Sequence, residues 1–214
     1  ANLNIIQNRT CGHGIHMRYG NIYLSNLSIS GVSEGSNHSL LSFSDAQIEI
    51  NNAELKNHSN HLLHLSKSTF EFRDLLIKNE GVSTEHPKIW MDSSSGSFDN
   101  VSIDATDDSM GLFSRSSNVS IYNSEINSSR EAIIAEASNF RMESSKFSSI
   151  NNDTLSLKAS KLRVHNSEIF SSGDECLDLE ISTAAIYSSK LSTTTPSGDA
   201  AFDLEYNSTL ILES

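Results

Sequence analysis

The chain has 214 residues, of which 36% are hydrophobic and 20% are charged, and its formal net charge is −12. This acidic balance, with no basic stripe along the chain, argues against a nucleic-acid partner, because surfaces that bind nucleic acids are basic. No apolar run approaches the roughly 20 residues of a membrane-spanning helix, so no membrane span is expected. The low apolar fraction favours a fold with a narrow core and a large surface.

One short pattern recurs along the whole chain. It reads apolar-x-apolar-x-(Asn or small polar)-small-x-apolar, as in IEINNAEL over 48–55 and VSIYNSEI over 119–126. A strand-type pattern with a period of about 20 to 30 residues is typical of a solenoid, in which each repeat is one coil stacked on the last. The repeats begin, in chain order, at Leu3, Ile22, Ile48, Phe70, Gly96, Val119, Phe140, Leu162, Ala184 and Leu210.

A second alternating stretch precedes most of these repeats. Strict alternation indicates a strand with one buried face, so each coil is expected to hold three short strands, two tight corners and one variable loop. Three strands per coil, stacked in register, predict an all-β parallel β-helix of about ten coils of ~22 residues, forming a single domain over 1–214. The second stretches fall, in chain order, at 15–19, 41–43, 63–65, 89–91, 112, 133–137, 155–159, 177–181 and 202–206.

Two kinds of column follow from this register. Opposite charges alternate at one position in Glu125, Lys146, Glu168 and Lys190, and at another in Glu136, Lys158 and Glu180. Such stacked pairs stabilise a sheet by roughly 0.2–1 kcal/mol each. Stacked polar side chains in one corner predict an asparagine ladder along the axis. That corner column is expected to contain Gln7, Asn26, Asn52, Asp74, Asn100, Asn123, Ser144, Asn166, Ser188 and Ser214.

With this repeat, the whole chain resembles the right-handed parallel β-helix (pectin-lyase-like) superfamily, and most closely the repeats of large bacterial surface and secreted proteins. CGHGI over 11–15 is similar to the Gly-His-Gly-Ile element of polygalacturonases, and GDECL over 173–177 to their Gly-Asp-Asp-Cys element. Those enzymes bring the two elements onto neighbouring coils, whereas His13 and Asp174 here fall seven coils apart. The family's Asn-Thr-Asp and Arg-x-Lys elements are missing. The resemblance therefore implies the right-handed fold and not polygalacturonase hydrolysis.

One outward column is the first candidate site. It stacks Trp90, Phe113 and Ile134 on the outside of a sheet, with Asp92 and Arg115 beside them. An exposed apolar stripe rimmed by polar groups often marks a contact surface. Aromatic rings beside an Asp and an Arg suit the stacking of a sugar, or a protein partner. The alternative is that a long loop, at 81–86 or 104–108, folds over the stripe.

Stacked carboxylates form a candidate calcium site. Asp178 is expected above Asp203, and Glu180 above Glu205. Like charges about 5 Å apart cost energy unless a cation relieves them, and calcium prefers oxygen ligands. The alternative is a solvated acidic face.

Histidines form a candidate site for zinc or copper. The candidate ligands are His13, His61 and His64, because imidazoles grouped on a rigid sheet can hold either metal. A strand places residues three apart on opposite faces, however, so no tight three-ligand set follows from the spacing.

These features favour a non-enzymatic extracellular or cell-surface module, a rigid rod that binds a glycan or a surface protein along the Trp90/Phe113 face. The rival is a polysaccharide-active enzyme on the same face. Asp178 and Asp203 have the spacing of a hydrolase pair, and Arg115 and Lys158 are the cations available to a lyase. The chain starts and stops inside a coil, which is expected of a segment of a longer protein or of a subunit that stacks end to end into a filament.

Overall fold

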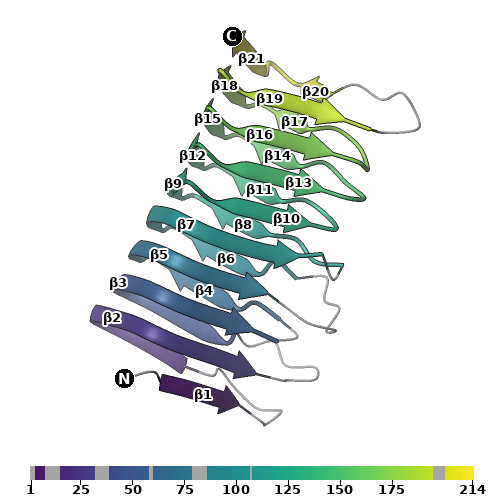
Figure 1. Ribbon diagram of the computed structural model, residues 1–214. Helices are drawn as coiled ribbons and strands as arrows, with labels where there is room; N and C mark the ends of the chain where they lie inside the picture. Colours follow the sequence, from purple (N-terminus) through teal and green to yellow (C-terminus); the bar gives the residue numbers. More distant parts are fainter. Residues whose placement is uncertain are drawn as a thin grey trace.

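The computed structural model is a stack of β-strand coils, with the N-terminal coil at one end of the rod and the C-terminal coil at the other (Figure 1). It describes residues 3–7, 15–31, 39–57, 60–78, 86–106, 108–194 and 201–214, and only the backbone of 3–7. Regular structure in these ranges is entirely β-strand, so they contain no helix that could cross a membrane. The expected all-β, right-handed parallel β-helix is confirmed.

Three parallel sheets run along the rod, and all neighbouring strands pair in register. Two long strands, β2 (Ile15–Gly31) and β3 (Leu41–Lys56), pass through all three sheets. Two more, β5 (Thr69–Lys78) and β7 (Ser95–Ala105), pass through the second and third.

We name the sheets A, B and C in the order in which each coil visits them. Sheet A continues through β4 (Leu63–Ser66), β6 (Ile89–Asp92), β8 (Leu112–Arg115), β11 (Ile133–Glu136), β14 (Leu155–Lys158), β17 (Leu177–Glu180) and β20 (Phe202–Glu205). Sheet B continues through β9 (Asn118–Tyr122), β12 (Asn139–Glu143), β15 (Lys161–His165), β18 (Thr183–Tyr187) and β21 (Thr209–Glu213). Sheet C begins with β1 (Leu3–Gln7) and ends with β10 (Glu125–Ser128), β13 (Lys146–Ser149), β16 (Glu168–Ser171) and β19 (Lys190–Thr193).

The number of coils is smaller than expected, at about eight turns of ~22 residues instead of ten. The expected count included the incomplete coils at both ends. The first repeat was also placed in the wrong strand, because Leu3 pairs with Leu27 and Gln7 with Gly31. Leu3–Gln7 therefore belongs to sheet C, and Gln7 lies outside the corner column to which the sequence pattern assigned it.

The corner between sheets B and C is built on a left-handed backbone. Every corner residue from Asn26 to Ser188 has a φ between 46° and 54°. Asn and Asp tolerate this region better than other residues with a side chain, which explains their frequency at the corner. Amide hydrogen bonds link two pairs of described corner residues, Asn52 to Asn26 at 2.7 Å and Asn100 to Asp74 at 2.5 Å. Backbone conformation, more than a continuous asparagine ladder, accounts for the pattern.

Two ladders of serines, buried except for the last member of each, run parallel to the axis, each one residue after a corner. In the ladder between sheets A and B, the N–H of each serine donates to the Oγ of the serine in the next coil, at 2.9–3.2 Å. The ladder between sheets B and C repeats this geometry at 3.0–3.1 Å. These hydroxyls satisfy backbone groups that would otherwise be buried without a partner. The members are Ser68, Ser94, Ser117, Ser138, Ser160, Ser182 and Ser208, and Ser124, Ser145, Ser167 and Ser189.

The core is a narrow column of inward side chains along the axis. It contains an aromatic cluster in which the ring of Phe70 lies 4.9 Å from that of Phe72 and 5.0 Å from that of Phe98. Gly96 makes room for this cluster, since a Cβ at that position would overlap the carbonyl oxygen and ring of Phe70. Because each coil contributes only a few inward side chains, each one carries a large share of local stability.

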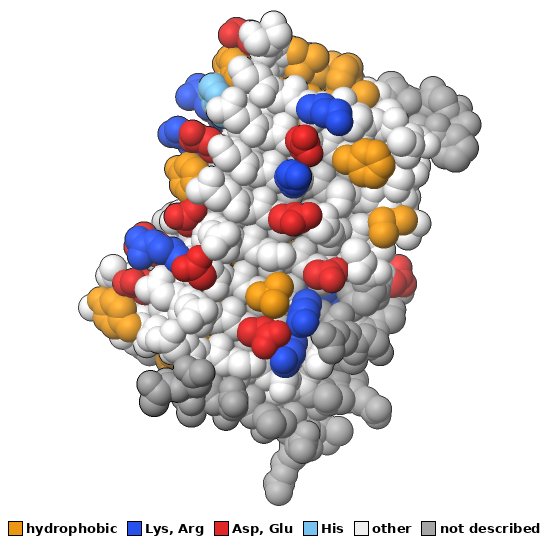
Figure 2. Space-filling view, in the orientation of Figure 1, with side chains coloured by type: hydrophobic (Ala, Val, Ile, Leu, Met, Phe, Trp, Pro, Cys, Tyr) orange, Lys and Arg blue, Asp and Glu red, His pale blue; other side chains and the backbone are white. Residues whose placement is uncertain are grey.

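Sheet C shows the expected alternation of charge. Glu125, Lys146, Glu168 and Lys190 are register partners in β10, β13, β16 and β19. Lys146 and Glu168 lie 3.8 Å apart. Figure 2 shows the alternating red and blue side chains along this face. The expected alternation of charge is also present on sheet A, where Lys158 contacts Glu180 at 2.7 Å.

Candidate functional site

The outward face of sheet A holds the aromatic stripe at the expected place. Trp90 is the register partner of Phe113, and Phe113 of Ile134, so the three stack across β6, β8 and β11. The Trp90 and Phe113 ring centroids lie 4.4 Å apart. All three side chains are half-buried and face outward. The rings thus form a firm apolar surface that still reaches solvent.

An ion pair borders the stripe in the next outward column. Arg115 donates to Asp92 across the two strands, with Nη2 2.9 Å from Oδ2. This hydrogen bond holds the pKa of Asp92 below its ordinary value and raises that of Arg115. The pair therefore stays charged over the physiological range and offers both a donor and an acceptor beside the rings.

Three histidines gather around Trp90. The ring of His61 lies 5.2 Å from that of Trp90, 5.5 Å from that of His86 and 6.3 Å from that of His64. His61 Nδ1 also lies 2.8 Å from the carbonyl oxygen of Pro87, which fixes the ring. In the described part of the chain these histidines do not come close enough to one another to form a three-ligand group. They extend the aromatic surface, and His13, the third expected ligand, lies outside the described residues.

The acidic residues lie at the C-terminal end of the same sheet. Asp178 stacks on Asp203 and Glu180 on Glu205, as expected. Asp178 accepts a hydrogen bond from Ser156 at 3.3 Å, and Glu180 is paired with Lys158. Burial, chiefly, raises the pKa of Asp178. Calcium at these four carboxylates stays a prediction.

A closer group of carboxylates lies at the turns that precede sheet A. Oxygen atoms of Asp153, Asp174 and Glu175 lie within 4.8 Å of one another. Desolvation, followed by hydrogen bonds that the protonated Glu175 carboxyl group donates to Asp174 and Asp153, raises the pKa of Glu175 to about 8. The pKa of Asp153 is also raised, again mainly by burial. The repeat pattern does not determine the path of the loop that brings Asp153 to Glu175, so this cluster was not among the predicted sites.

This cluster predicts a fall in stability between about pH 4.5 and pH 8. Glu175 has a raised folded-state pKa, so the native protein keeps a proton that the unfolded chain loses over this window. The free energy of unfolding should therefore decrease as the pH rises through it, by about 1 kcal/mol after allowance for solvent screening. Urea unfolding at several pH values measures the slope. Glu175→Gln should flatten it, whereas Glu125→Gln on sheet C should not, and an unchanged slope in Glu175→Gln would contradict this assignment.

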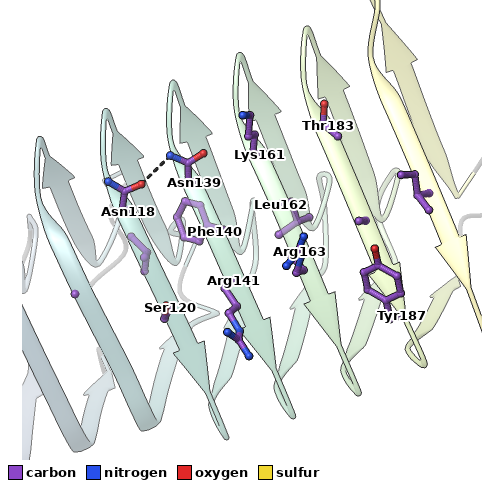
Figure 3. A pocket seen from close by; sticks show the side chains of 14 residues that line it. Asn118, Ser120, Asn139, Phe140, Arg141, Lys161, Leu162, Arg163, Thr183 and Tyr187 are labelled. Carbon is purple, nitrogen blue, oxygen red and sulfur yellow. Dashed lines mark hydrogen bonds between the residues drawn. The ribbon is translucent and has the colours of Figure 1, made fainter.

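One structural hollow was missed by sequence reasoning. A groove of about 660 Å³ runs along the outward face of sheet B, from β7 to β21. Figure 3 shows Arg141, Lys161, Arg163 and Tyr187 along it. The pattern KLRVH over 161–165, with three basic or imidazole side chains at alternate positions, was the available signal.

Comparisons with known proteins place the fold. No protein-family model matches the chain, and no curated protein matches it in sequence. Among solved structures it is similar to the A-module of mannuronan C-5 epimerase AlgE4 from Azotobacter vinelandii, with a TM-score of 0.54 and 8% identity over 89% of this chain and 69% of that one. This likeness, at 8% identity, concerns the parallel β-helix fold alone.

Two further solved structures are similar over most of their length. The A-module of the epimerase AlgE6 from the same organism has a TM-score of 0.44 and 9% identity, covering 99% of this chain and 80% of that one. PfbA, a surface adhesin of Streptococcus pneumoniae, has a TM-score of 0.36 and 9% identity, covering 92% of this chain and 70% of that one.

Proposed function

We propose that the protein is a rigid extracellular or cell-surface module that binds a glycan chain along the outward face of sheet A. The observation that carries the proposal is the Trp90–Phe113 stack, 4.4 Å between centroids, on the outward face of sheet A, where Ile134 follows in the next coil. Aromatic rings that face outward in pairs are typical of surfaces that stack on sugar rings.

The surroundings of the stack support a polar, extended ligand. The charged pair Asp92–Arg115 offers hydrogen-bond partners to hydroxyl groups. The sheet continues past Ile134 to Ser156 and Asp178 in the same column, four strands from Trp90 or about 19 Å. A chain of several sugars fits a surface of that length. Because the protein backbone of the sheet is rigid, the protein loses little conformational entropy on binding.

A glycan-array screen tests the proposal. The wild-type protein should give a specific signal, and Trp90→Ala/Phe113→Ala should lose it by at least tenfold while keeping its circular dichroism spectrum. Phe170→Ala removes an outward aromatic ring from sheet C and serves as the matched control, which should bind normally. Parallel screens with calcium and with a chelator test whether binding requires calcium at the stacked carboxylates of Asp178, Glu180, Asp203 and Glu205. Equal binding by the double variant, or binding to a surface protein and no glycan, would overturn the proposal.

A second candidate function is hydrolysis or lysis of a polysaccharide on the same face. The observation that favours it is the pKa of Glu175, which is raised to about 8, so that this carboxyl group holds a proton near neutral pH. A general acid in a glycoside hydrolase has this property. Release of shortened products from the bound glycan, lost in Glu175→Gln, would establish an enzyme. Binding without product in the wild type would leave the module non-enzymatic.

A further inference from the structure

In the described part of the chain, a tight corner borders the outward face of sheet B on each side. The chain passes from sheet A to sheet B, and from sheet B to sheet C, in most coils through a corner of two residues. The first residue of each corner has a left-handed backbone, and the second is a serine in the coils that form the two ladders. Among the described residues, the longer connections, such as 129–132, 150–154 and 172–176, lie at the third corner, between sheets C and A. Figure 1 shows sheet B along one edge of the rod, away from these loops. The corresponding face of another molecule can therefore approach it.

Charge is divided along this face. In the central outward column, the N-terminal strands β3 and β5 carry Glu49 and Glu71, and the C-terminal strands β12 and β15 carry Arg141 and Arg163. Between them, β7 and β9 carry the small residues Ser97 and Ser120. The column thus reads acidic, small, basic along the axis.

The basic half contains charges without local partners. Arg141 pairs with Glu143 at 3.2 Å. Arg163 and Lys161 make no ion pair within the described ranges, although they lie on adjacent outward positions of β15. Arg141 and Arg163 are direct register partners, and like charges in that position are unfavourable unless an anion relieves them. A partner that brings carboxylates to this place would be stabilised.

The same face of a second copy of the chain supplies carboxylates opposite Arg141 and Arg163. When two copies meet face to face with their axes antiparallel, the twofold axis falls between β7 and β9. Each strand of one copy then lies over the strand of the second copy that is equally far from the twofold axis, so that β5 lies over β12 and β3 over β15. Glu71 meets the second copy's Arg141, and Glu49 meets Arg163.

The neighbouring outward column follows the same rule. It carries Arg73 on β5 and Glu143 on β12, which face each other across the same twofold axis. Arg73 forms an ion pair with Glu71 within its own chain, so the meeting of the two copies makes a four-charge network of alternating sign. Among the described charges of the two columns, no like pair is opposed.

The shapes of the two sheet B faces also fit the antiparallel arrangement. Tyr23 on β2 is 69% exposed and stands out from the acidic end of the face. In the antiparallel arrangement it lies over β18, where Ala185 and Thr183 line the hollow. The overlap of eight strands, about 38 Å long and about 16 Å wide, covers roughly 600 Å² per copy or 1,200 Å² in total. That is the lower end of the range of specific interfaces.

We propose that the protein forms an antiparallel twofold dimer through the outward face of sheet B, with Glu49 against Arg163 and Glu71 against Arg141 of the second copy. The dimer leaves sheet A uncovered, so it is compatible with ligand binding there and independent of it. It presents two Trp90 faces in one particle, which would raise the avidity for a repeating ligand.

Sedimentation velocity over a range of protein concentrations tests the dimer. The wild type should show a monomer–dimer equilibrium that weakens at least tenfold between low and high salt, because exposed charge pairs are screened. Glu49→Arg and Arg163→Glu should each weaken the dimer at least tenfold. Lys190→Glu, an equal charge change on sheet C, should have no effect.

Mixing gives the decisive outcome. In an equimolar mixture of the Glu49→Arg and Arg163→Glu proteins, each chain supplies the charge that the other needs, so a heterodimer of wild-type strength should appear. The double variant Glu49→Arg/Arg163→Glu should also dimerise by itself. A wild type that is monomeric at all concentrations, or a mixture that stays monomeric, overturns the proposal. So does a monomer whose sheet B groove binds an acidic polysaccharide instead.

Discussion

Replacing Phe72 with alanine is expected to lower the free energy of unfolding by about 3–5 kcal/mol. Phe72 is fully buried, and its ring lies 4.9 Å from that of Phe70 and 5.6 Å from that of Phe98. The cavity cannot collapse, because both flanking strands are held in register by backbone hydrogen bonds to the coils on either side. Urea unfolding followed by circular dichroism measures the loss.

The matched control for this site is Phe72→Leu. Other coils place aliphatic side chains in the same column, Ile50 before Phe72 and Ile121 after Phe98. Leucine should therefore cost less than about 1.5 kcal/mol. A loss below about 1 kcal/mol for Phe72→Ala would show that the aromatic cluster is not the packed centre of the narrow core.

Removal of one serine hydroxyl from a ladder should cost about 1–3 kcal/mol. Ser117 is 1% exposed, and its Oγ accepts the N–H of Ser94 at 3.0 Å and donates to the carbonyl of Arg115 at 2.8 Å. Alanine at this position leaves the N–H of Ser94 buried without a partner. The alanine side chain itself fits, so the effect isolates the hydrogen bond.

The adjacent residue provides the control. Ser116 is an exposed corner residue with a φ of 53°, and alanine occupies the equivalent corner at Ala137 and Ala159. Ser116→Ala should therefore change the free energy of unfolding by less than about 0.5 kcal/mol. Equal effects of Ser116→Ala and Ser117→Ala in thermal unfolding would contradict the ladder.

Much of the fold was predictable because a period of two and a repeat of ~22 residues leave few alternatives. The stacking of Trp90 on Phe113 and of Lys146 on Glu168 followed from that register and is confirmed. The placement of Leu3–Gln7 was wrong because so short an apolar stretch fits sheet B as well as sheet C. The pairing of Leu3–Gln7 with Leu27–Gly31 assigns the stretch to sheet C, and the sequence pattern alone does not reveal this pairing.

The parts that the sequence did not reveal depend on loops or on hydrogen bonds. The histidines around Trp90 and the approach of Asp153 to Glu175 follow from loop paths, which a repeat pattern does not determine. The serine ladders had a signal, a serine directly after each corner residue, but serine is so common in this chain that the signal did not stand out. The divided charge of sheet B appears only when the strands are set side by side.

The most direct test of ligand binding on sheet A is the fluorescence of Trp90, the single tryptophan of the chain. Titration with a glycan selected from the array should shift its emission saturably, with the same midpoint as binding measured by calorimetry, because the sugar stacks on that ring. Calorimetric binding with no change in the emission of Trp90 would place the ligand elsewhere and contradict the proposed function of this face.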